Sequence, residues 1–539
     1  MTTQKPLPRI FVDLSREIRL EYLPPLMVYL AAGISGLTAI VGTFFVKDYL
    51  GFSAEFLAGL GFWAMLPWSL KLPLGHLVDI VWRHKFLLVY LGAGLIAASL
   101  CIMLGLLTDR AALEALLPAG TWYVISTVLA PIGYVLQDVV ADAMTVEAVP
   151  RCDATGNPLP EAQKHAMNAT MQTLGRIAII GGTLLVAAIN VLLFRDVETL
   201  AEAGKIAVYQ DIYRMALAIP LVSVLGVLLA TALHRRHVRE LAARGYSMAE
   251  IRAMTTTQEE PPRPNPWILG GGLAFAVVSL SVGMQQMAYG QELIFVISMA
   301  IILALMGQIL KEMDSASRQT LLGTAILIFV FRAVPGPGPG SNWWMIDELG
   351  FNQAFMARLS LISSGTALLG LFWFRRFMAE KSMTTIILTL TLATTVLSLP
   401  TIGLFYGLHH WTARLTAGMV DARFIALVDT ALESPLGQVA MVPMLAWIAQ
   451  SAPPKLKATF FAVMASFTNL SLVLGQLATQ YLNKLYTVTR EVKDAATGAV
   501  RVAADYHQLG ELLIISSLLG LILPVLAVVL IRWLRLKSV

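Results

Sequence analysis

The sequence predicts an all-α multi-pass membrane protein, and its composition is the first observation behind this prediction. Of the 539 residues, 57% are hydrophobic and only 14% are charged, whereas about 25% of the residues of a soluble domain carry a charge. The second observation is a series of apolar runs long enough to cross a bilayer as helices, which takes about 20 residues. A transmembrane barrel would instead show short segments of alternating hydrophobicity.

Fourteen apolar segments are predicted to span the membrane, the seventh and eighth of them as a tight hairpin around Tyr289 and Gly290. The first apolar run is too long for the hydrophobic region of a secretory signal, so we expect no cleaved leader. In chain order the segments cover residues 24–46, 56–80, 86–107, 121–147, 166–194, 211–233, 267–287, 289–310, 320–336, 352–375, 384–406, 421–450, 458–482 and 511–534.

An internal repeat is the third observation, and it predicts how the spans are grouped. Residues 46–60 and 345–359 are identical at seven of fifteen positions, and each stretch leads from the first helix of a half into its second. We therefore expect two parallel six-helix halves, which is the layout of the major-facilitator fold, with the transport site at the midplane between them.

The predicted domains follow from this repeat. They are an N-terminal half over residues 1–233, a cytoplasmic linker over 234–266, an inserted transmembrane hairpin over 267–310 and a C-terminal half over 311–539. Within the linker, Ser247 and Glu250 have the spacing of a helix capping box, which predicts a short surface helix.

The distribution of basic residues predicts the orientation in the membrane. With a cytoplasmic N-terminus, the inner segments hold about 24 of the 39 lysines and arginines and the outer loops about 9. Basic residues concentrate on the cytoplasmic side of membrane proteins. We therefore expect a protein of the cell (inner) membrane with both termini in the cytoplasm.

Two acidic residues inside the fourth predicted span are the strongest functional signal. Asp138 and Asp142 are four residues apart and so lie on one face of a helix. A charged residue at the centre of a membrane helix costs roughly 2.5–3.5 kcal/mol on insertion scales. We therefore expect this face to look into a water-filled cavity or toward cations.

The twelfth predicted span carries a similar acidic pair, Asp429 and Glu433. The cations predicted to partner the acidic residues are Lys71 in the second span and Arg176 in the fifth, and both are candidates for binding an anionic substrate. Trp68 lies three residues before Lys71, on the same helix face, and either stacks on a flat substrate or packs between helices. An alternative for each acidic residue is a buried ion pair that only joins helices.

A loop motif ends the second predicted span. Gly75, Asp79 and Arg83 follow the pattern of a glycine, an aspartate and then basic residues, which resembles the loop motif of major-facilitator transporters. The resemblance implies that Asp79 pairs or caps across the cytoplasmic face and controls closure on that side.

Taken together, these motifs resemble the folate–biopterin transporter family. The resemblance rests on residues 67–71 with Gly75 and Asp79, on 138–147, on 349–351 and on 452–469. It implies a secondary transporter, proton-coupled, for folates or pterins. The runner-up is the muropeptide permease group, which shares fourteen spans and an aspartate-rich fourth helix. The extra hairpin favours that group, whereas residues 452–469 favour the folate–biopterin group.

The predicted function is proton-coupled transport of a small organic anion by alternating access, with Asp138, Asp142, Asp429 and Glu433 as the candidates for proton coupling. We expect a monomer in the lipid bilayer, with no nucleic-acid partner and no cofactor. The two cysteines, Cys101 and Cys152, lack the spacing of metal ligands. No nucleophile or phosphate-binding motif suggests an enzyme. A lipid scramblase and a receptor without transport remain as alternatives of other classes.

Overall fold

The computed structural model describes residues 19–149, 159–248, 250, 251, 266–285, 287, 289–311, 313–441, 443, 444, 447, 448, 457–493 and 500–537. The chain divides into two compact units by its internal contacts. The first unit comprises Met1–Thr38, Pro73–Val186 and Ile206–Leu269, and the second comprises Ala39–Leu72, Ala187–Lys205 and Gly270–Val539. The division into two sequence halves at a linker and a hairpin stays a prediction.

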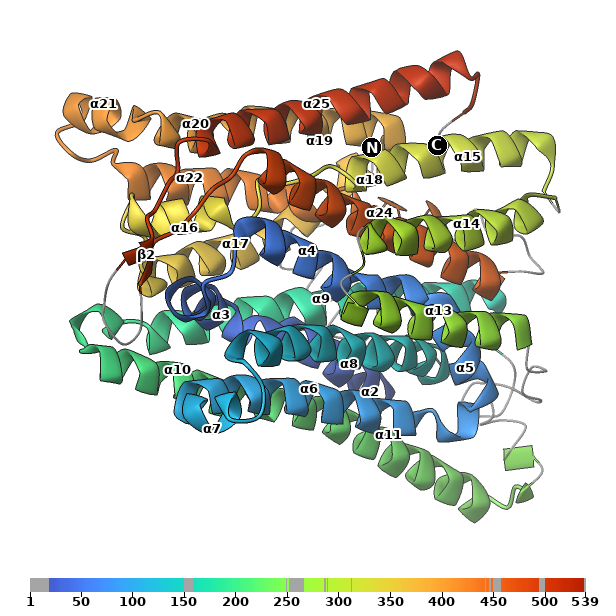
Figure 1. The fold of residues 1–539 in the computed structure, drawn as a ribbon. Helices are drawn as coiled ribbons and strands as arrows, with labels where there is room; N and C mark the ends of the chain where they lie inside the picture. Colours follow the sequence, from blue (N-terminus) through green and yellow to red (C-terminus); the bar gives the residue numbers. More distant parts are fainter. Residues whose placement is uncertain are drawn as a thin grey trace. The chain divides into compact units, whose positions relative to one another are not determined.

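The first unit is a set of long helices, of which α8 is central. Helix α8 packs against α6 and α2, and α2 and α6 in turn contact α11 (Figure 1). The helices that lie wholly or mainly in this unit are η1 (Leu20–Tyr22), α2 (Leu23–Gly33), η2 (Ile34–Thr38), α5 (Lys71–Ile80), η5 (Trp82–His84), α6 (Phe86–Thr108), α7 (Arg110–Glu114), α8 (Ala119–Ala148), α9 (Glu161–Leu193), α10 (Glu202–Ala216) and α11 (Ala218–Ala243).

Glycines bring the helices of the first unit into backbone contact. A Cβ atom on Gly92 of α6 would lie 2.6 Å from the carbonyl oxygen of Gly133 on α8, and the reverse holds for Gly133. Likewise, a Cβ atom on Gly33 of α2 would lie 2.3 Å from the carbonyl oxygen of Ile179 on α9. Close approach at small residues drives helix association in lipid, where no hydrophobic force operates between helices.

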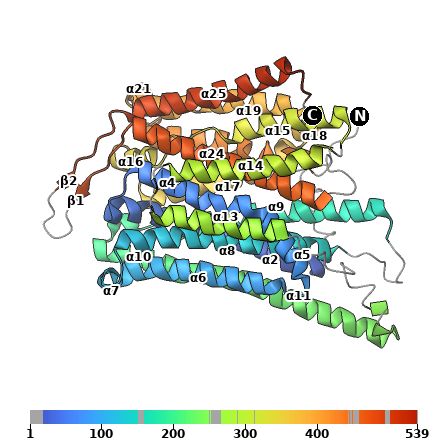
Figure 2. The same ribbon diagram turned by 45° about the vertical axis from the view of Figure 1, so that its right-hand side comes forward.

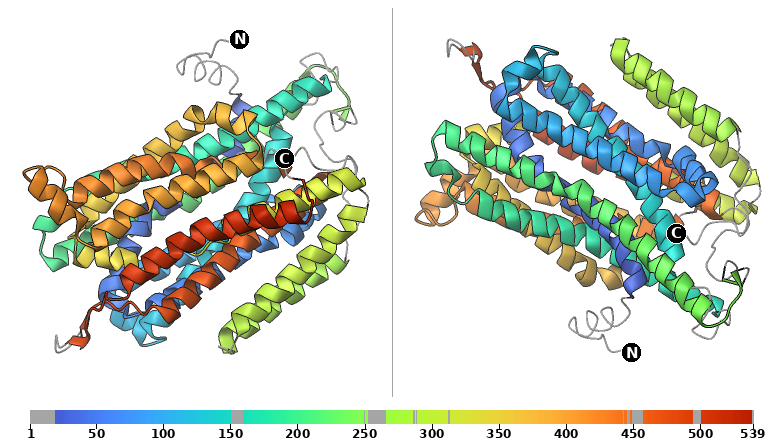
Figure 3. Two further views of the ribbon diagram at one scale, coloured as in Figure 1. Left: turned by 90° about the horizontal axis from the view of Figure 1, so that it is seen from above. Right: turned by 90° about the horizontal axis from the view of Figure 1, so that it is seen from below.

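The second unit is also helical and includes one small β-hairpin. Its helices are α3 (Ala39–Phe45), η3 (Val46–Leu50), α4 (Ala54–Met65), η4 (Leu66–Leu70), η6 (Val197–Thr199), α13 (Pro266–Gln285), α14 (Gly290–Lys311), α15 (Ser315–Arg332), α16 (Gly340–Asp347), α17 (Gln353–Trp373), α18 (Arg375–Glu380), α19 (Met383–Leu397), α20 (Leu399–Phe405), α21 (Leu408–Leu415), α22 (Ala422–Glu433), η7 (Ser434–Gln438), α24 (Lys457–Leu485) and α25 (Leu509–Trp533). Helix α24 packs against α4, α14 and α15, and α25 packs against α15 and α19 (Figure 3).

The two copies of the sequence repeat have the same local structure. Gly51 and Gly350 are both in the left-handed conformation, with φ of 69° and 63°. Two residues later, Ser53 and Asn352 each cap a helix by accepting a hydrogen bond from the backbone N–H three residues on. The left-handed backbone favours glycine because a side chain would clash there. The repeat therefore encodes one turn that starts α4 and α17 alike.

The predicted fold class, an all-α membrane protein, is confirmed. Within the described residues, nine helices are long and apolar enough to cross a membrane by length and composition. The five predicted spans outside this set are 56–80, 267–287, 320–336, 421–450 and 458–482, and each contains a helix in the structure. The count of fourteen spans stays a prediction.

Two of these five predicted spans are broken, not continuous. The 56–80 segment forms α4, then the 3-10 turn η4 with Pro67, then α5. In the 421–450 segment, helix α22 ends at Glu433, and the 3-10 turn η7, which contains Pro435, follows it. Proline lacks the N–H that an α-helix needs at this point, so it interrupts the hydrogen-bond ladder. Broken backbone at membrane depth is tolerated where it is buried in protein or lines a cavity.

Two smaller features complete the comparison with the sequence. The predicted capping box is confirmed, because Ser247 N–H donates to Glu250 Oε2 at 2.7 Å and Glu250 N–H to Ser247 Oγ at 3.3 Å. The loop before α25 holds an antiparallel hairpin that was not predicted, β1 (Val492–Lys493) and β2 (Val500–Val502), seen at one end of the second unit in Figure 2.

The predicted orientation can be tested at helix α16, which lies between α15 and α17 in the chain. A cysteine at the exposed position Asn342, in a chain with Cys101 and Cys152 replaced by serine, is expected to react with a membrane-impermeant maleimide in intact cells. A cysteine at the exposed position Arg239 of α11 should react only after the membrane is opened. Labelling of position 342 only in opened cells would overturn the topology.

Candidate functional site

Helix α8 carries the acidic pair. The contacts of Gln137, the residue before Asp138, show which side of α8 packs against α6 and α11. Gln137 is 2% exposed. Its amide Nε2 donates to Ser223 Oγ on α11 at 2.9 Å and to the Val89 carbonyl oxygen on α6 at 3.3 Å. Since residues 138 and 142 lie on a different side of the helix from 137, Asp138 and Asp142 face away from these contacts. Both aspartates are half-buried.

Tyr29 on α2 is the partner of the acidic pair that sequence analysis missed. Its hydroxyl donates a hydrogen bond to Asp142 Oδ1 at 2.6 Å, and the residue is 6% exposed. The tyrosine lies 113 positions from the aspartate, so no local pattern joins them. A signal was present nevertheless, because a tyrosine inside a membrane helix needs a partner for its O–H group.

Arg176 on α9 joins the same cluster, as one of the two predicted cations. Asp138 and Arg176 both lie near enough to Tyr29 to act on its hydroxyl electrostatically. Gly175, the residue before Arg176, allows α9 to approach Tyr29 closely, since a Cβ atom at this position would lie 2.9 Å from Cε2 of the Tyr29 ring. Thus α2, α8 and α9 bring two carboxylates, a phenol and a guanidinium together in the first unit.

Lys71 and Trp68, the other predicted binding residues, belong to the second unit and contact each other. The Lys71 ammonium lies 5.7 Å from the centroid of the Trp68 ring, within cation–π range. The Trp68 carbonyl oxygen accepts a hydrogen bond from Asn469 Nδ2 of α24 at 3.0 Å. Both residues lie at the helix break η4. Trp68 is half-buried, and its indole face holds the cation.

Arg332, the last residue of α15, is a further cation in the second unit, to which the sequence gave no role. Its Nε donates to the Thr468 carbonyl oxygen at 3.2 Å, and its Nη1 lies 3.3 Å from the sulfur of Met441 and 3.9 Å from that of Met444. A carbonyl oxygen and two polarizable sulfur atoms therefore orient the guanidinium. It lies on α15 beside α24, the helix that also carries Asn469.

The second predicted acidic pair lies on α22 at the other helix break. Asp429 Oδ2 accepts a hydrogen bond from Thr401 Oγ1 at 3.1 Å. Its other oxygen, Oδ1, is buried and has no hydrogen-bond partner within the described residues. Glu433 is exposed and is the last residue of α22 before the 3-10 turn η7. Of this pair, the Asp429 carboxylate is held by a hydrogen bond, whereas the Glu433 carboxylate is exposed.

The sequence profile of the BT1 family matches residues 32–537 of the chain. The chain belongs to the BT1 family. A folate-biopterin transporter of Synechocystis sp. (strain ATCC 27184 / PCC 6803 / Kazusa) is 24% identical over 471 residues, which is 86% of this chain and 75% of that protein. The resemblance found in the sequence is therefore confirmed.

Solved structures show that this BT1 family protein shares the fold of known transporters. A POT family transporter in complex with a thioalcohol-conjugated peptide superimposes with a TM-score of 0.57 at 14% identity, over 95% of both chains. The nucleoside transporter NupG superimposes with a TM-score of 0.51 at 10% identity, over 95% of this chain and 99% of that one. The protein is a membrane transporter and not an enzyme.

Close to the loop motif of this BT1 family protein lies a partly buried ion pair that the sequence did not reveal. Asp79 on α5 is half-buried and Arg83 is exposed in the turn η5. Lys85, which directly follows this motif, is 4% exposed. Its Nζ contacts Glu147 Oε1 at 2.6 Å. It also lies 4.3 Å from the centroid of the Trp82 ring and 5.0 Å from that of the Phe86 ring. This pair ties the start of α6 to the end of α8.

The contact between Tyr29 and Asp142 yields a direct prediction. Replacing Tyr29 with phenylalanine removes one donor from the carboxylate but keeps the ring, and a hydrogen bond to a charged group contributes about 1.5–3 kcal/mol. We expect the initial rate at which the purified protein takes up labelled substrate into vesicles to fall by about tenfold or more. Tyr90→Phe, on an exposed tyrosine of α6, is the matched control. Equal uptake by both variants would show that Tyr29 is not part of the transport site.

Proposed function

We propose that this BT1 family transporter moves a small organic anion, such as a folate or pterin, coupled to protons. The observation that carries the proposal is the cluster of Asp142, Tyr29, Asp138 and Arg176 inside apolar helices of the first unit. Ionisable residues inside a membrane are costly and mark substrate or proton pathways. The relative's name, folate-biopterin transporter, supports the substrate class.

The chemistry of a pterin suits the side chains present. Its 2-amino-pyrimidinone edge offers two adjacent N–H donors, which a carboxylate accepts as a pair. Its flat ring suits an indole such as Trp68. Arg176 in the first unit is the candidate for binding the carboxylates of a folate, and Lys71 in the second unit stays a candidate for the same role. Either Asp138 or Asp142 would bind the 2-amino-pyrimidinone edge of the pterin, and both stay candidates.

Proton coupling requires a group that changes its protonation state during the cycle. An apolar environment disfavours the charged form of a carboxyl group, and a nearby cation or donor favours it. A carboxyl group that leaves its cation and enters a water-filled path would therefore exchange a proton. Asp138, Asp142, Asp429 and Glu433 remain the candidates, and the buried, unpartnered Oδ1 of Asp429 within the described chain adds weight to that residue.

We propose further that alternating access closes the outer side through one charged contact inside the second unit. The Lys47 ammonium lies 2.5 Å from Asp347 Oδ1, and the Tyr506 hydroxyl donates to Asp347 Oδ2 at 2.5 Å. The side chains of Lys47 and Asp347 are 13% and 26% exposed. Lys47 belongs to the predicted first half and Asp347 to the second, so rocking of the halves would separate them.

Amide variants test the coupling. Asp138→Asn, Asp142→Asn, Asp429→Asn and Glu433→Gln are each reconstituted in vesicles, with and without an imposed pH gradient. The variant that removes the coupling group should retain exchange of labelled substrate and lose accumulation driven by the gradient. Glu198→Gln, on an exposed residue of η6, is the control. Parent-like accumulation by all four variants would show that these carboxylates are structural.

The substrate class needs a separate experiment. A thermal-shift screen of the purified protein against folates, pterins, muropeptides and nucleotides is expected to show stabilisation by folates or pterins. Stabilisation by muropeptides alone would favour the alternative substrate class. Vesicles that move labelled lipid without any soluble substrate would favour a scramblase, and binding without flux would favour a receptor.

A further inference from the structure

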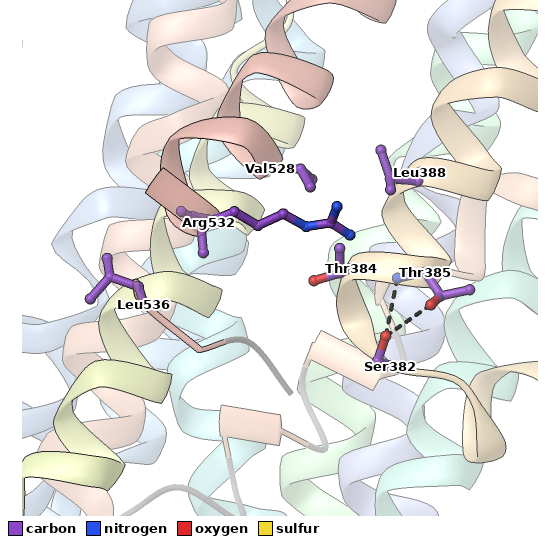
Figure 4. Close-up of a pocket in the computed structure, with 8 residues that line it drawn as sticks. Ser382, Thr384, Thr385, Leu388, Val528, Arg532 and Leu536 are labelled. Atoms are coloured by element: carbon purple, nitrogen blue, oxygen red, sulfur yellow. Dashed lines mark hydrogen bonds between the residues drawn. The ribbon is translucent and has the colours of Figure 1, made fainter. Parts of the chain in front are cut away.

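A cavity of about 250 Å³ lies between α19 and α25 in the second unit, away from the residues proposed for transport. Its walls are of two kinds. Ser382, Thr384, Thr385 and Arg532 are polar, and Leu388, Val528, Ile531 and Leu536 are apolar. The cavity lies at the start of α19 and the end of α25 (Figure 4), which is the predicted cytoplasmic side.

Arg532 is the only charged residue that lines this cavity among the described residues. Figure 4 shows its side chain reaching from α25 toward Thr384 on the facing helix. Within the described chain it forms no ion pair with a carboxylate, whereas Arg376 on nearby α18 pairs with Glu380. Two of the hydroxyl groups are already engaged, since Ser382 Oγ and Thr385 Oγ1 are hydrogen-bonded to each other at 2.9 Å.

We propose that this cavity binds an anionic phosphate group, with the guanidinium of Arg532 as its main contact. Guanidinium groups bind phosphate through paired, charge-assisted hydrogen bonds. Basic pockets between helices on the cytoplasmic side of a membrane bind anionic lipid headgroups. The aliphatic residues beside Arg532 match the first carbons of an acyl chain, so a phospholipid headgroup suits both kinds of wall. A soluble phosphate compound would use the polar wall alone.

The test measures lipid retention by the full-length protein with native mass spectrometry, after exchange into phosphatidylglycerol or phosphatidylcholine. The parent is expected to retain phosphatidylglycerol, and Arg532→Gln to bind it at least about tenfold more weakly. Arg532→Lys, which keeps the charge but loses the planar fork, should fall between them. Arg535→Gln is the matched control, because it removes the same charge from an exposed position outside the cavity.

Two further outcomes separate the sources of the phosphate. If inorganic phosphate raises the melting temperature in neutral lipid, and Arg532→Gln abolishes this effect, the site accepts a soluble phosphate group. If only phosphatidylglycerol has an Arg532-dependent effect, the ligand is a lipid headgroup. Equal loss of phosphatidylglycerol in Arg532→Gln and Arg535→Gln, or equal retention of both lipids by the parent, would overturn the proposal.

Discussion

Replacing Lys85 with alanine is expected to lower the free energy of unfolding by about 2 kcal/mol. The Lys85 ammonium is buried and is paired with Glu147, whose side chain is 31% exposed. Removing the lysine leaves the Glu147 carboxylate without its counter-charge. It also removes a buried side chain that lies against the Trp82 and Phe86 rings. The exposure of Glu147 keeps the effect below the roughly 3–5 kcal/mol found when a fully buried pair is broken.

The measurement is the thermal unfolding midpoint of the purified protein in detergent. Arg110→Ala is the matched control, because Arg110 and Glu114 form an ion pair of similar length, 2.7 Å, with side chains that are 40% and 42% exposed. Exposed pairs of this kind contribute at most about 1 kcal/mol. Replacing Lys85 and Glu147 together by leucine should restore part of the lost stability. Similar midpoints for Lys85→Ala and Arg110→Ala would contradict the assignment.

Joining positions 47 and 347 by a short crosslinker is expected to stop transport almost completely. Cysteines replace Lys47 and Asp347 in a chain whose Cys101 and Cys152 are serine, and a short bismaleimide connects them. If the contact opens in each cycle, a covalent link holds the outer side closed. This prediction rests on the proposed role of the Lys47–Asp347 contact.

Each single cysteine variant, treated with the same reagent, serves as one control. A cysteine pair at 110 and 114 is a second, since these residues are one turn apart on the same helix, α7, and their crosslinking should leave transport unchanged. Uptake of labelled substrate into vesicles is the measurement. Parent-like uptake by fully crosslinked protein would mean that these residues stay together throughout the cycle, and the outer contact would not be a gate.

Helix positions, the membrane class and the family followed from the sequence because each depends on local composition or on short motifs. Long apolar runs need internally satisfied backbone groups in lipid, so they form helices whatever their neighbours are. The turn at Gly51 and Gly350 is equally local, since the left-handed backbone and the cap two residues later lie within one short stretch. The capping box at Ser247 and Glu250 is a third example.

The tertiary structure alone decided which polar groups meet. The sequence marked Asp142 as unusual, but Tyr29 became its partner only when Gly175 allowed α9 against the tyrosine ring and α2 packed on α8. Lys85 looked like any cytoplasmic cation until Glu147 and two aromatic rings enclosed it. Pairing of this kind depends on side chains that are distant in the chain, and neither periodicity nor composition records which helix faces which.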